Sequence, residues 1–324
     1  MGRILEIKNL STHFETEYGV IKAVDDVDLV VDEGDTLGIV GESGCGKTVL
    51  ALSIMRLVPR PPGRIISGNI MFNGVDLLQL DDEKMRKVRG KDISMIFQEP
   101  MTSLNPVLRI GDQITEAIKL HQGLDTLEAM NRAIETLHLV GMPSPETLVR
   151  NYPHQLSGGM RQRAMIAMAI SCKPRLMLAD EPTTALDVTI QAQIIDLMNR
   201  LKEDVGTSII LITHDLGVIA EAVQYVAVMY TGGIVEYSSV GNLFSTPLHP
   251  YTVGLMESIP KITASGGKNE YLKVIPGVVP PLYNLPVGCS FQERCPHVMN
   301  ICREEEPLLK EKNPGHKVHC WRYG

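Results

Sequence analysis

The sequence predicts an α/β fold with a parallel sheet, followed by a smaller loop-rich appendage. Two short apolar runs, residues 176–179 and 208–212, are typical of buried strands, and residues 190–201 between them have helical spacing. This alternation is typical of a parallel sheet. Beyond about residue 240, prolines become frequent and four cysteines gather, which predicts a separate appendage with few regular elements.

The other elements follow from the same patterns. Apolar alternation at residues 4–10, 27–31 and 37–40 predicts strands, so the first third should be rich in β-structure. Residues 113–140 have helical spacing, and residues 162–170 continue it after a Gly-Gly break. We expect these stretches to form a helical subdomain and the α/β core to end near Glu236.

Composition narrows the class of protein. The chain has 324 residues, 44% of them apolar, with 31 Lys and Arg against 38 Asp and Glu, a net charge of −7. A large core is therefore expected, and broad non-specific binding of nucleic acid is not. Neither a run of about 20 apolar residues nor a signal peptide is evident. We therefore expect a cytosolic chain without structural disulfides.

A phosphate-binding loop is the clearest motif. Residues 41–48 read Gly-Glu-Ser-Gly-Cys-Gly-Lys-Thr, which fits G-x-x-x-x-G-K-[ST], and they lie between an apolar strand and a helical stretch, as this motif requires. Backbone N–H groups would bind phosphate oxygens, Lys47 would reach the β and γ phosphates, and Thr48 would offer its hydroxyl to Mg²⁺. The predicted ATP-binding residues here are Gly41, Ser43, Gly44, Cys45, Gly46, Lys47 and Thr48.

Two carboxylates follow the apolar run 176–179. A buried strand that ends in Asp180 and Glu181 would deliver both side chains to one edge of the sheet. Asp180 would then hold Mg²⁺ and Glu181 would polarise the attacking water. By itself such a pair could equally cap the following helix.

Between these two motifs, residues 156–163 read Leu-Ser-Gly-Gly-Met-Arg-Gln-Arg, which resembles the signature sequence of ABC ATPases. The resemblance extends over residues 1 to about 240. In it Gln98 is similar to the Q-loop glutamine, Ala185-Leu186-Asp187 to the D-loop, and His214 to the switch histidine. Each residue alone could be structural, but the elements occur together in the family's order.

The resemblance implies a P-loop NTPase with a RecA-like core and with antiparallel β and helical subdomains. It implies an ABC nucleotide-binding domain at residues 1–240, its helical subdomain at about 99–165, and a C-terminal domain at 241–324. Two such domains would meet head to tail around two ATP molecules, with Ser157, Gly158 and Gly159 of one closing on the phosphates of the other. His214 would hydrogen-bond the γ-phosphate, Gln98 would sense Mg²⁺ and water, and Asp187 would couple the two sites.

An aromatic residue before the P-loop stacks on adenine in this family. Tyr18, just before Gly19, is our candidate, and Phe14 is the competitor.

Residues 98–106, Gln-Glu-Pro-Met-Thr-Ser-Leu-Asn-Pro, and the tail motif around Cys289 and Cys295 resemble the ATPases of bacterial oligopeptide and dipeptide importers. Nickel importers share much of this pattern. The resemblance implies a peripheral protein on the cytoplasmic face of the membrane. The residues after Gln98, together with residues 110–120, would form the groove that contacts the permease. The resemblance also implies a second ATPase subunit, identical or paralogous, and an external binding protein as an indirect partner.

Three rival classes fit less well. ABC-type DNA-repair ATPases carry long coiled coils between P-loop and signature, and no sustained heptad occurs here. ABC-type translation factors join two nucleotide domains, whereas this chain has one P-loop. A nucleotide-binding regulator would not need Glu181 and His214, so ATPase activity would separate it from an enzyme.

The tail cysteines are Cys289, Cys295, Cys302 and Cys320. Disulfides are disfavoured in the cytosol, and the short C-x₂₋₄-C pairs of zinc sites are absent. A [4Fe–4S] cluster tolerates varied spacing, and some importers resembling this one carry one, so we expect a structural cluster here, with zinc or no metal as the alternatives. His297, His316 and His319 are alternative ligands. Cys45 and Cys172 are expected to be packing residues, with Cys45 a candidate for alkylation.

Overall fold

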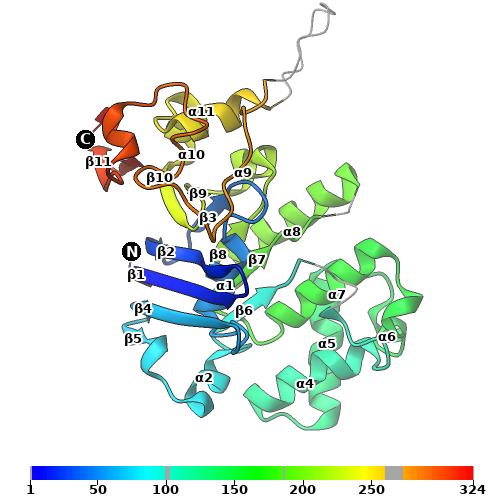
Figure 1. The fold of residues 1–324 in the computed structure, drawn as a ribbon. Coiled ribbons are helices and arrows are strands. Elements are labelled where there is room, and N and C mark those ends of the chain that lie inside the picture. Colours follow the sequence, from blue (N-terminus) through cyan, green and yellow to red (C-terminus); the bar gives the residue numbers. More distant parts are fainter. Residues whose placement is uncertain (1, 99–102, 185–186, 260–272, 324) are drawn as a thin grey trace, which may run out of the picture. The chain divides into compact units, whose positions relative to one another are not determined.

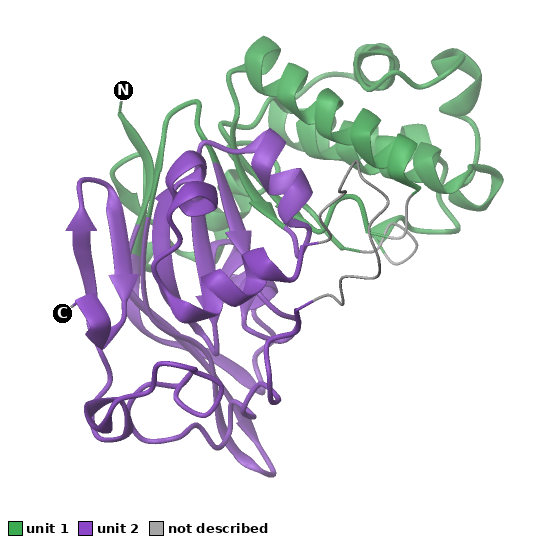
Figure 2. Cartoon of the chain, turned by 90° about the horizontal axis from the view of Figure 1, so that it is seen from above, with its two compact units in different colours: residues 1–6, 30–36, 70–212 green, residues 7–29, 37–69, 213–324 purple. Residues whose placement is uncertain are grey.

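The computed structural model describes residues 2–98, 103–184, 187–259 and 273–323. The chain divides into two compact units (Figure 2). Unit 1 comprises residues 1–6, 30–36 and 70–212, and unit 2 comprises residues 7–29, 37–69 and 213–324. Each unit is described by itself.

Unit 1 contains three buried parallel strands in the order β6-β7-β8. These are β6 (Ile93–Ile96), β7 (Leu176–Asp180) and β8 (Ser208–Ile212). Leu176 pairs with Ile93 on one side and with Ser208 on the other. Every residue of the three strands is buried, which explains their continuous apolar runs. The parallel arrangement that the sequence predicts is therefore confirmed.

The helices of unit 1 include a group in which α5 packs against α4 and α7 (Figure 1). The helices of this unit are α2 (Asp82–Val88), α4 (Ile110–Gln122), α5 (Thr126–Leu139), α6 (Pro145–Leu148), α7 (Gly158–Ile170) and α8 (Val188–Val205). The helical stretch expected at residues 113–140 consists of two helices, α4 and α5. Gly123 ends α4 in a left-handed conformation, and Asp125 begins α5 with a capping box to Glu128.

Unit 2 holds five paired strands in the order β11-β12-β10-β9-β3. They are β3 (Thr36–Val40), β9 (Tyr225–Tyr230), β10 (Gly233–Ser239), β11 (Leu309–Asn313) and β12 (His316–His319). Strands β3 and β9 are parallel, and the other pairs are antiparallel. The loop-rich tail thus contributes a hairpin, β11–β12, whose strand β12 pairs with β10. The sequence patterns do not predict this hairpin.

Helices α1 (Lys47–Ile54), α9 (Leu216–Ala222), α10 (Val240–Ser245) and α11 (Pro250–Glu257) also belong to unit 2. A smaller sheet has the order β2-β1-β4-β5, and the chain passes from one unit to the other along three of its strands. Its members are β1 (Arg3–Thr16), β2 (Gly19–Asp32), β4 (Gly63–Phe72) and β5 (Val75–Asp76). The predicted β-rich first third is confirmed. Of the helices that the structure describes, none is both long and apolar enough to cross a lipid bilayer.

Candidate nucleotide-binding site

The P-loop connects the end of β3 at Val40 to the start of α1 at Lys47. Gly46 caps α1 with a φ of 104°, and a Cβ atom there would lie 2.0 Å from the carbonyl oxygen of Ala23. A Cβ atom on Gly41 would lie 2.2 Å from the carbonyl oxygen of Met229. Any residue other than glycine would clash with the neighbouring backbone at both positions. A Cβ on Gly44 would meet no atom within 4 Å, so this side of the loop is open.

Lys47 is fixed inside the loop that precedes it. Its Nζ atom donates to the carbonyl oxygen of Gly41 at 2.8 Å and to that of Glu42 at 3.0 Å, and the residue is buried. Ser43 and Thr48 are exposed. The ammonium charge is therefore held at the start of α1, where the helix dipole already favours an anion.

Cys45 lies in the same loop but is 1% exposed. Burial raises the pKa of its thiol, and the nearby Lys47 charge offsets this only in part. Because alkylation requires an accessible thiolate, the expectation that Cys45 is an alkylation site does not fit its surroundings.

In unit 1, β7 delivers both predicted carboxylates. Asp180 is buried at the last position of the strand, and Glu181 follows it with a φ of 46°. The Gln98 side-chain amide donates to Glu181 Oε2 at 3.0 Å, and the Thr184 hydroxyl donates to the same oxygen at 2.8 Å. The structure thus brings the predicted Q-loop glutamine and the predicted catalytic glutamate together.

The signature residues begin helix α7. Ser157 is its N-cap, with a side-chain oxygen that accepts from the Met160 N–H at 3.3 Å. Ser157 and Gly158 are exposed, and a Cβ on Gly158 would meet nothing within 4 Å. Gly159 is needed for packing, because a Cβ there would lie 3.2 Å from the Ile190 side chain. This 13-residue helix presents the geometry of an anion site, a helix N-terminus without an acidic residue in its first turn.

Asp187 is the N-cap of α8 and accepts from the Ile190 N–H at 2.9 Å. Ala185 and Leu186 of the predicted D-loop lie outside the described residues, as do residues 99–102 of the predicted permease-contacting segment. In unit 2, His214 is exposed in the connection between β8 and α9. The next residue, Asp215, caps α9 and thereby fixes the backbone beside His214.

Tyr18 occupies the turn between β1 and β2 and is 78% exposed. Its ring lies 6.0 Å, centroid to centroid, from that of Tyr283 in the tail. Phe14 is half-buried and faces Gly63, where an added Cβ would lie 2.8 Å from its ring. The exposed ring of Tyr18 is the one of the two that could stack on a base.

The interactions of Glu42 in the P-loop with the tail were not predicted from the sequence. The Glu42 carboxylate forms a bidentate ion pair with Arg294 of the tail, with Nη1–Oε2 at 2.7 Å and Nη2–Oε1 at 3.0 Å. The Glu42 N–H donates to the hydroxyl of Tyr251 at 2.8 Å. The sequence holds one hint, since Arg294 directly precedes Cys295 in the tail motif, but nothing local joins it to residue 42.

All six cysteines are free thiols, and the four in the tail influence one another. Burial is the main cause that raises the pKa of Cys289 to about 12, and the charges of Cys302, Cys320 and Cys295 contribute to the same rise. Burial is also the main cause of the raised pKa of Cys295 and Cys320. The Cys289 N–H also donates to the carbonyl oxygen of Cys302 at 2.8 Å, so these two cysteines are neighbours in unit 2.

Three of these sulfurs share a local backbone pattern. The amide two residues further along the chain, in Phe291, His297 and Arg322, hydrogen-bonds the thiols of Cys289, Cys295 and Cys320 respectively. For Cys295 the N···S distance is 3.4 Å. Such N–H···S bonds favour thiolate over thiol. In the part of the chain that the structure describes, no three His, Cys, Asp or Glu side chains are gathered as ligands of a single metal ion.

Of the three histidines considered as alternative ligands, His316 has a side-chain partner in the fold. His316 Nε2 pairs with the buried Glu236 carboxylate at 2.7 Å. Burial lowers the pKa of His319 to about 4. The histidine of the Cys295-Pro296-His297 sequence contributes its backbone N–H to Cys295.

Comparison with known proteins places these features in a family. Residues 24–184 match the family model described as ABC transporter, and residues 235–302 match the one described as oligopeptide/dipeptide transporter, C-terminal region. An oligopeptide transport ATP-binding protein of Bacillus subtilis is 50% identical over 323 residues, which cover 100% of this chain and 98% of the relative. This chain belongs to the ABC transporter family. The resemblance drawn from its motifs is confirmed.

Other relatives of this ABC protein agree. A protein of Sinorhizobium fredii, named a probable peptide ABC transporter ATP-binding protein, is 53% identical over 98% of this chain and 95% of its own length. A solved structure, a dimeric ATP-binding cassette in a post-hydrolysis state bound to ADP and phosphate, has a TM-score of 0.66 and 27% identity. It covers 73% of this chain and 98% of its own. The predicted P-loop NTPase fold is thereby confirmed.

Proposed function

We propose that this chain is the ATP-hydrolysing subunit of a membrane importer of dipeptides or oligopeptides. The observation that carries the proposal is similarity along the whole chain. Relatives named as peptide, oligopeptide and dipeptide transport ATP-binding proteins are 46–53% identical over 98–100% of this chain. The two family matches also support a division into a nucleotide-binding domain at 1–240, with its helical subdomain at about 99–165, and a C-terminal domain at 241–324.

In this function the P-loop binds the phosphates of ATP. The N–H groups around Gly44 and Gly46 hydrogen-bond phosphate oxygens, and Lys47 turns from its own loop carbonyls to the β and γ phosphates. Thr48, Gln98 and Asp180 supply hydroxyl, amide and carboxylate oxygens, the hard donors that suit Mg²⁺. Magnesium neutralises developing charge on the phosphates. Tyr18 stacks on the adenine.

Glu181 is the residue we assign to hydrolysis. Its carboxylate accepts a proton from the attacking water. The water oxygen forms the new bond to the γ-phosphorus as the bond to the β–γ bridging oxygen breaks, giving ADP and phosphate. Gln98 hydrogen-bonds Glu181 at 3.0 Å and so orients it. His214 donates to the γ-phosphate.

The partners follow from the same assignment. A second ATPase subunit, identical or paralogous, pairs head to tail with this one, so that Ser157, Gly158 and Gly159 close on the partner's ATP and Asp187 couples the two sites. The dimeric state of the solved relative supports this arrangement. The pair binds permease subunits at the cytoplasmic face of the membrane near residues 110–120, and an external binding protein delivers the peptide.

ATP turnover by the purified chain, alone and with its permease, tests the proposal. Lys47→Ala should abolish tight ATP binding. Glu181→Gln should keep ATP binding but lower kcat about 10²- to 10³-fold, the size expected for loss of a general base. Glu203→Gln, an exposed carboxylate of α8, is the matched control and should hydrolyse ATP as the wild type does. Normal turnover by the Glu181 variant would overturn its assigned role.

We also propose that Cys289, Cys295, Cys302 and Cys320 hold a [4Fe–4S] cluster. The backbone hydrogen bond between Cys289 and Cys302 supports this, and so do the N–H···S bonds to Cys289, Cys295 and Cys320, which favour thiolates. A cluster also spreads its thiolates more widely than one metal ion does. The cluster would draw the protons from these thiols and link distant loops of the tail.

Iron and acid-labile sulfide, measured on protein purified without oxygen, should each come to four per chain. Cys302→Ser should lower both, whereas the matched control Cys172→Ser, outside the tail, should leave them unchanged. Zinc in place of iron, or neither metal, would contradict the cluster and leave the ATPase assignment standing.

A further inference from the structure

The P-loop residue Glu42 is held through three of its groups, two of which are bound by the tail. Its carboxylate faces both terminal nitrogens of Arg294, its N–H donates to Tyr251, and its carbonyl oxygen accepts from Lys47 at 3.0 Å. Glu42 thus lies between the tail and the lysine that is assigned to the phosphates. Any displacement of Glu42 would move an acceptor of the Lys47 ammonium group.

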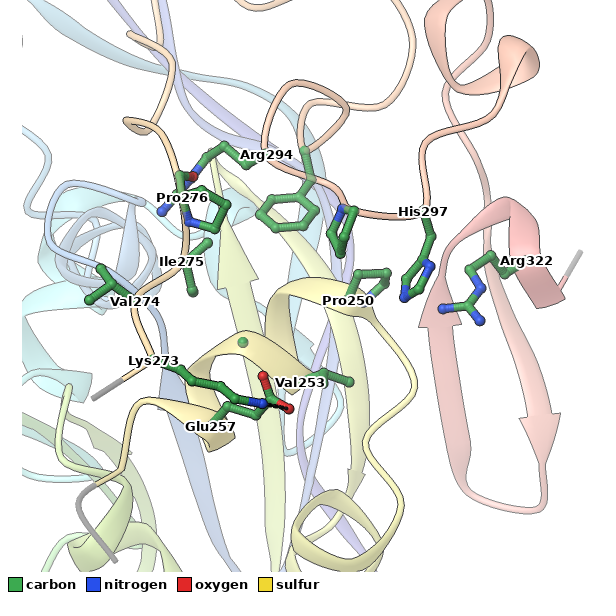
Figure 3. A pocket seen from close by; sticks show the side chains of 13 residues that line it. Pro250, Val253, Glu257, Lys273, Val274, Ile275, Pro276, Arg294, His297 and Arg322 are labelled. Atoms are coloured by element: carbon green, nitrogen blue, oxygen red, sulfur yellow. Dashed lines mark hydrogen bonds and ion pairs between the residues drawn. The ribbon is translucent and has the colours of Figure 1, made fainter. Parts of the chain in front are cut away.

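Arg294 is itself fixed firmly enough to position another residue. Its side chain is 4% exposed, and its Nε donates to the Pro276 carbonyl oxygen at 3.0 Å. Figure 3 shows Arg294 beside Pro276 at a pocket of about 140 Å³. The guanidinium carbon lies 5.8 Å from the ring centroids of both Tyr230 and Phe291.

These rings form a buried aromatic cluster behind the ion pair. Tyr230 lies 4.7 Å from Tyr251 and 5.3 Å from Phe291, centroid to centroid, and all three side chains are buried. The cluster joins β9, α11 and the cysteine-bearing tail. A bidentate pair against such a rigid, poorly solvated support is directional, unlike an exposed ion pair between flexible side chains.

We propose that Arg294 is a positioning residue for the P-loop, which acts through Glu42 to set the affinity for ATP. The inference rests on the proposed ATP-binding function and goes beyond it, since it assigns the tail a part in nucleotide binding. It follows that a nucleotide-binding domain without the tail would bind ATP with lower affinity.

The test measures the Kd of the full-length chain for a non-hydrolysable ATP analogue with Mg²⁺. Arg294→Met keeps the apolar stem in the aromatic cluster but removes the charge, and Glu42→Gln removes the charge from the other partner. Each should raise Kd about tenfold, the size expected for a lost charge-assisted pair. The double variant should raise Kd no further than the larger single effect, because both changes break one interaction.

The matched control is Lys273→Met. It removes the Lys273–Glu257 ion pair, which lines the same pocket (Figure 3) but is exposed, so it should leave Kd unchanged. If Arg294→Met proves unstable, the same ion pair can be tested with Glu42→Gln, which removes the negative charge, and with Arg294→Lys, which removes the bidentate geometry.

Kd values within twofold of the wild type, or single effects that multiply in the double variant, would overturn the inference. If Arg294 only stabilised the fold, Arg294→Met would lower the melting temperature, and its effect on Kd would not depend on whether residue 42 is Glu or Gln. Failure of the wild type to bind the analogue would instead refute the proposed function.

Discussion

At the scale of single residues, the P-loop shows how closely its sequence and its geometry agree. Gly41 and Gly46 are fixed by the carbonyl oxygens of Met229 and Ala23, which leave no room for a Cβ atom. Lys47 is buried although it is charged, and the two carbonyl oxygens that it binds compensate for this. Residues with such specific surroundings can be predicted from a motif because the motif records local backbone requirements.

The reactivity of Cys45 is a consequence of this packing. Because the thiol is buried and its pKa is raised, we expect iodoacetamide at pH 8 to modify it at least about tenfold more slowly in the folded protein than in urea. Peptide mass spectrometry after timed labelling measures this, with Cys172, which is half-buried, as an internal comparison. Equal rates for Cys45 in the folded and unfolded protein would contradict the burial described above.

At the scale of elements, helix boundaries depend on local signals that a periodic pattern can hide. The stretch 113–140 has continuous helical spacing, yet it contains a left-handed Gly123 and a capping box at Asp125 that separate α4 from α5. The tail hairpin β11–β12 was not predicted because its first strand has no recognisable apolar pattern. Strand β11 is mostly exposed and carries few apolar residues, so it is defined by pairing with β12 rather than by a pattern of its own.

Helix α11 depends on an unusual N-cap. His249 is buried, and its Nδ1 accepts the Tyr251 N–H at 3.1 Å, which requires this nitrogen to be unprotonated. Burial, aided by the nearby His319, lowers the pKa of His249 to about 3. Between pH 6.5 and 3 the unfolded chain therefore binds a proton at this residue that the folded chain does not. The free energy of unfolding should fall as the pH falls, by up to about 1.4 kcal/mol per pH unit for this group.

His249→Asn keeps an N-cap acceptor but cannot take up that proton. Urea unfolding at pH 7, 6 and 5 should show a shallower loss of stability for this variant than for the wild type. The comparison of slopes cancels the other titrating groups, which both proteins share. Identical slopes would mean that His249 is protonated in the folded protein.

At the scale of the whole molecule, sequence reasoning identified the family and the α/β core but missed the links between distant parts. Motifs report chemistry that is local in the chain, and periodicity reports which face of an element is buried. Neither reports that Arg294 pairs with Glu42, because two complementary charges 252 residues apart leave no spacing to recognise. The grouping of the tail cysteines, by contrast, was expected from the family resemblance, because their separations of five, six and seventeen residues match no single short pattern.

The same ion pair has a consequence during protein synthesis. Glu42 leaves the ribosome long before Arg294 does, and at about 5–20 residues per second the interval is roughly 13–50 s. Throughout that time the nascent P-loop lacks its Arg294 partner, so synthesis of the tail completes the surroundings of an element made much earlier.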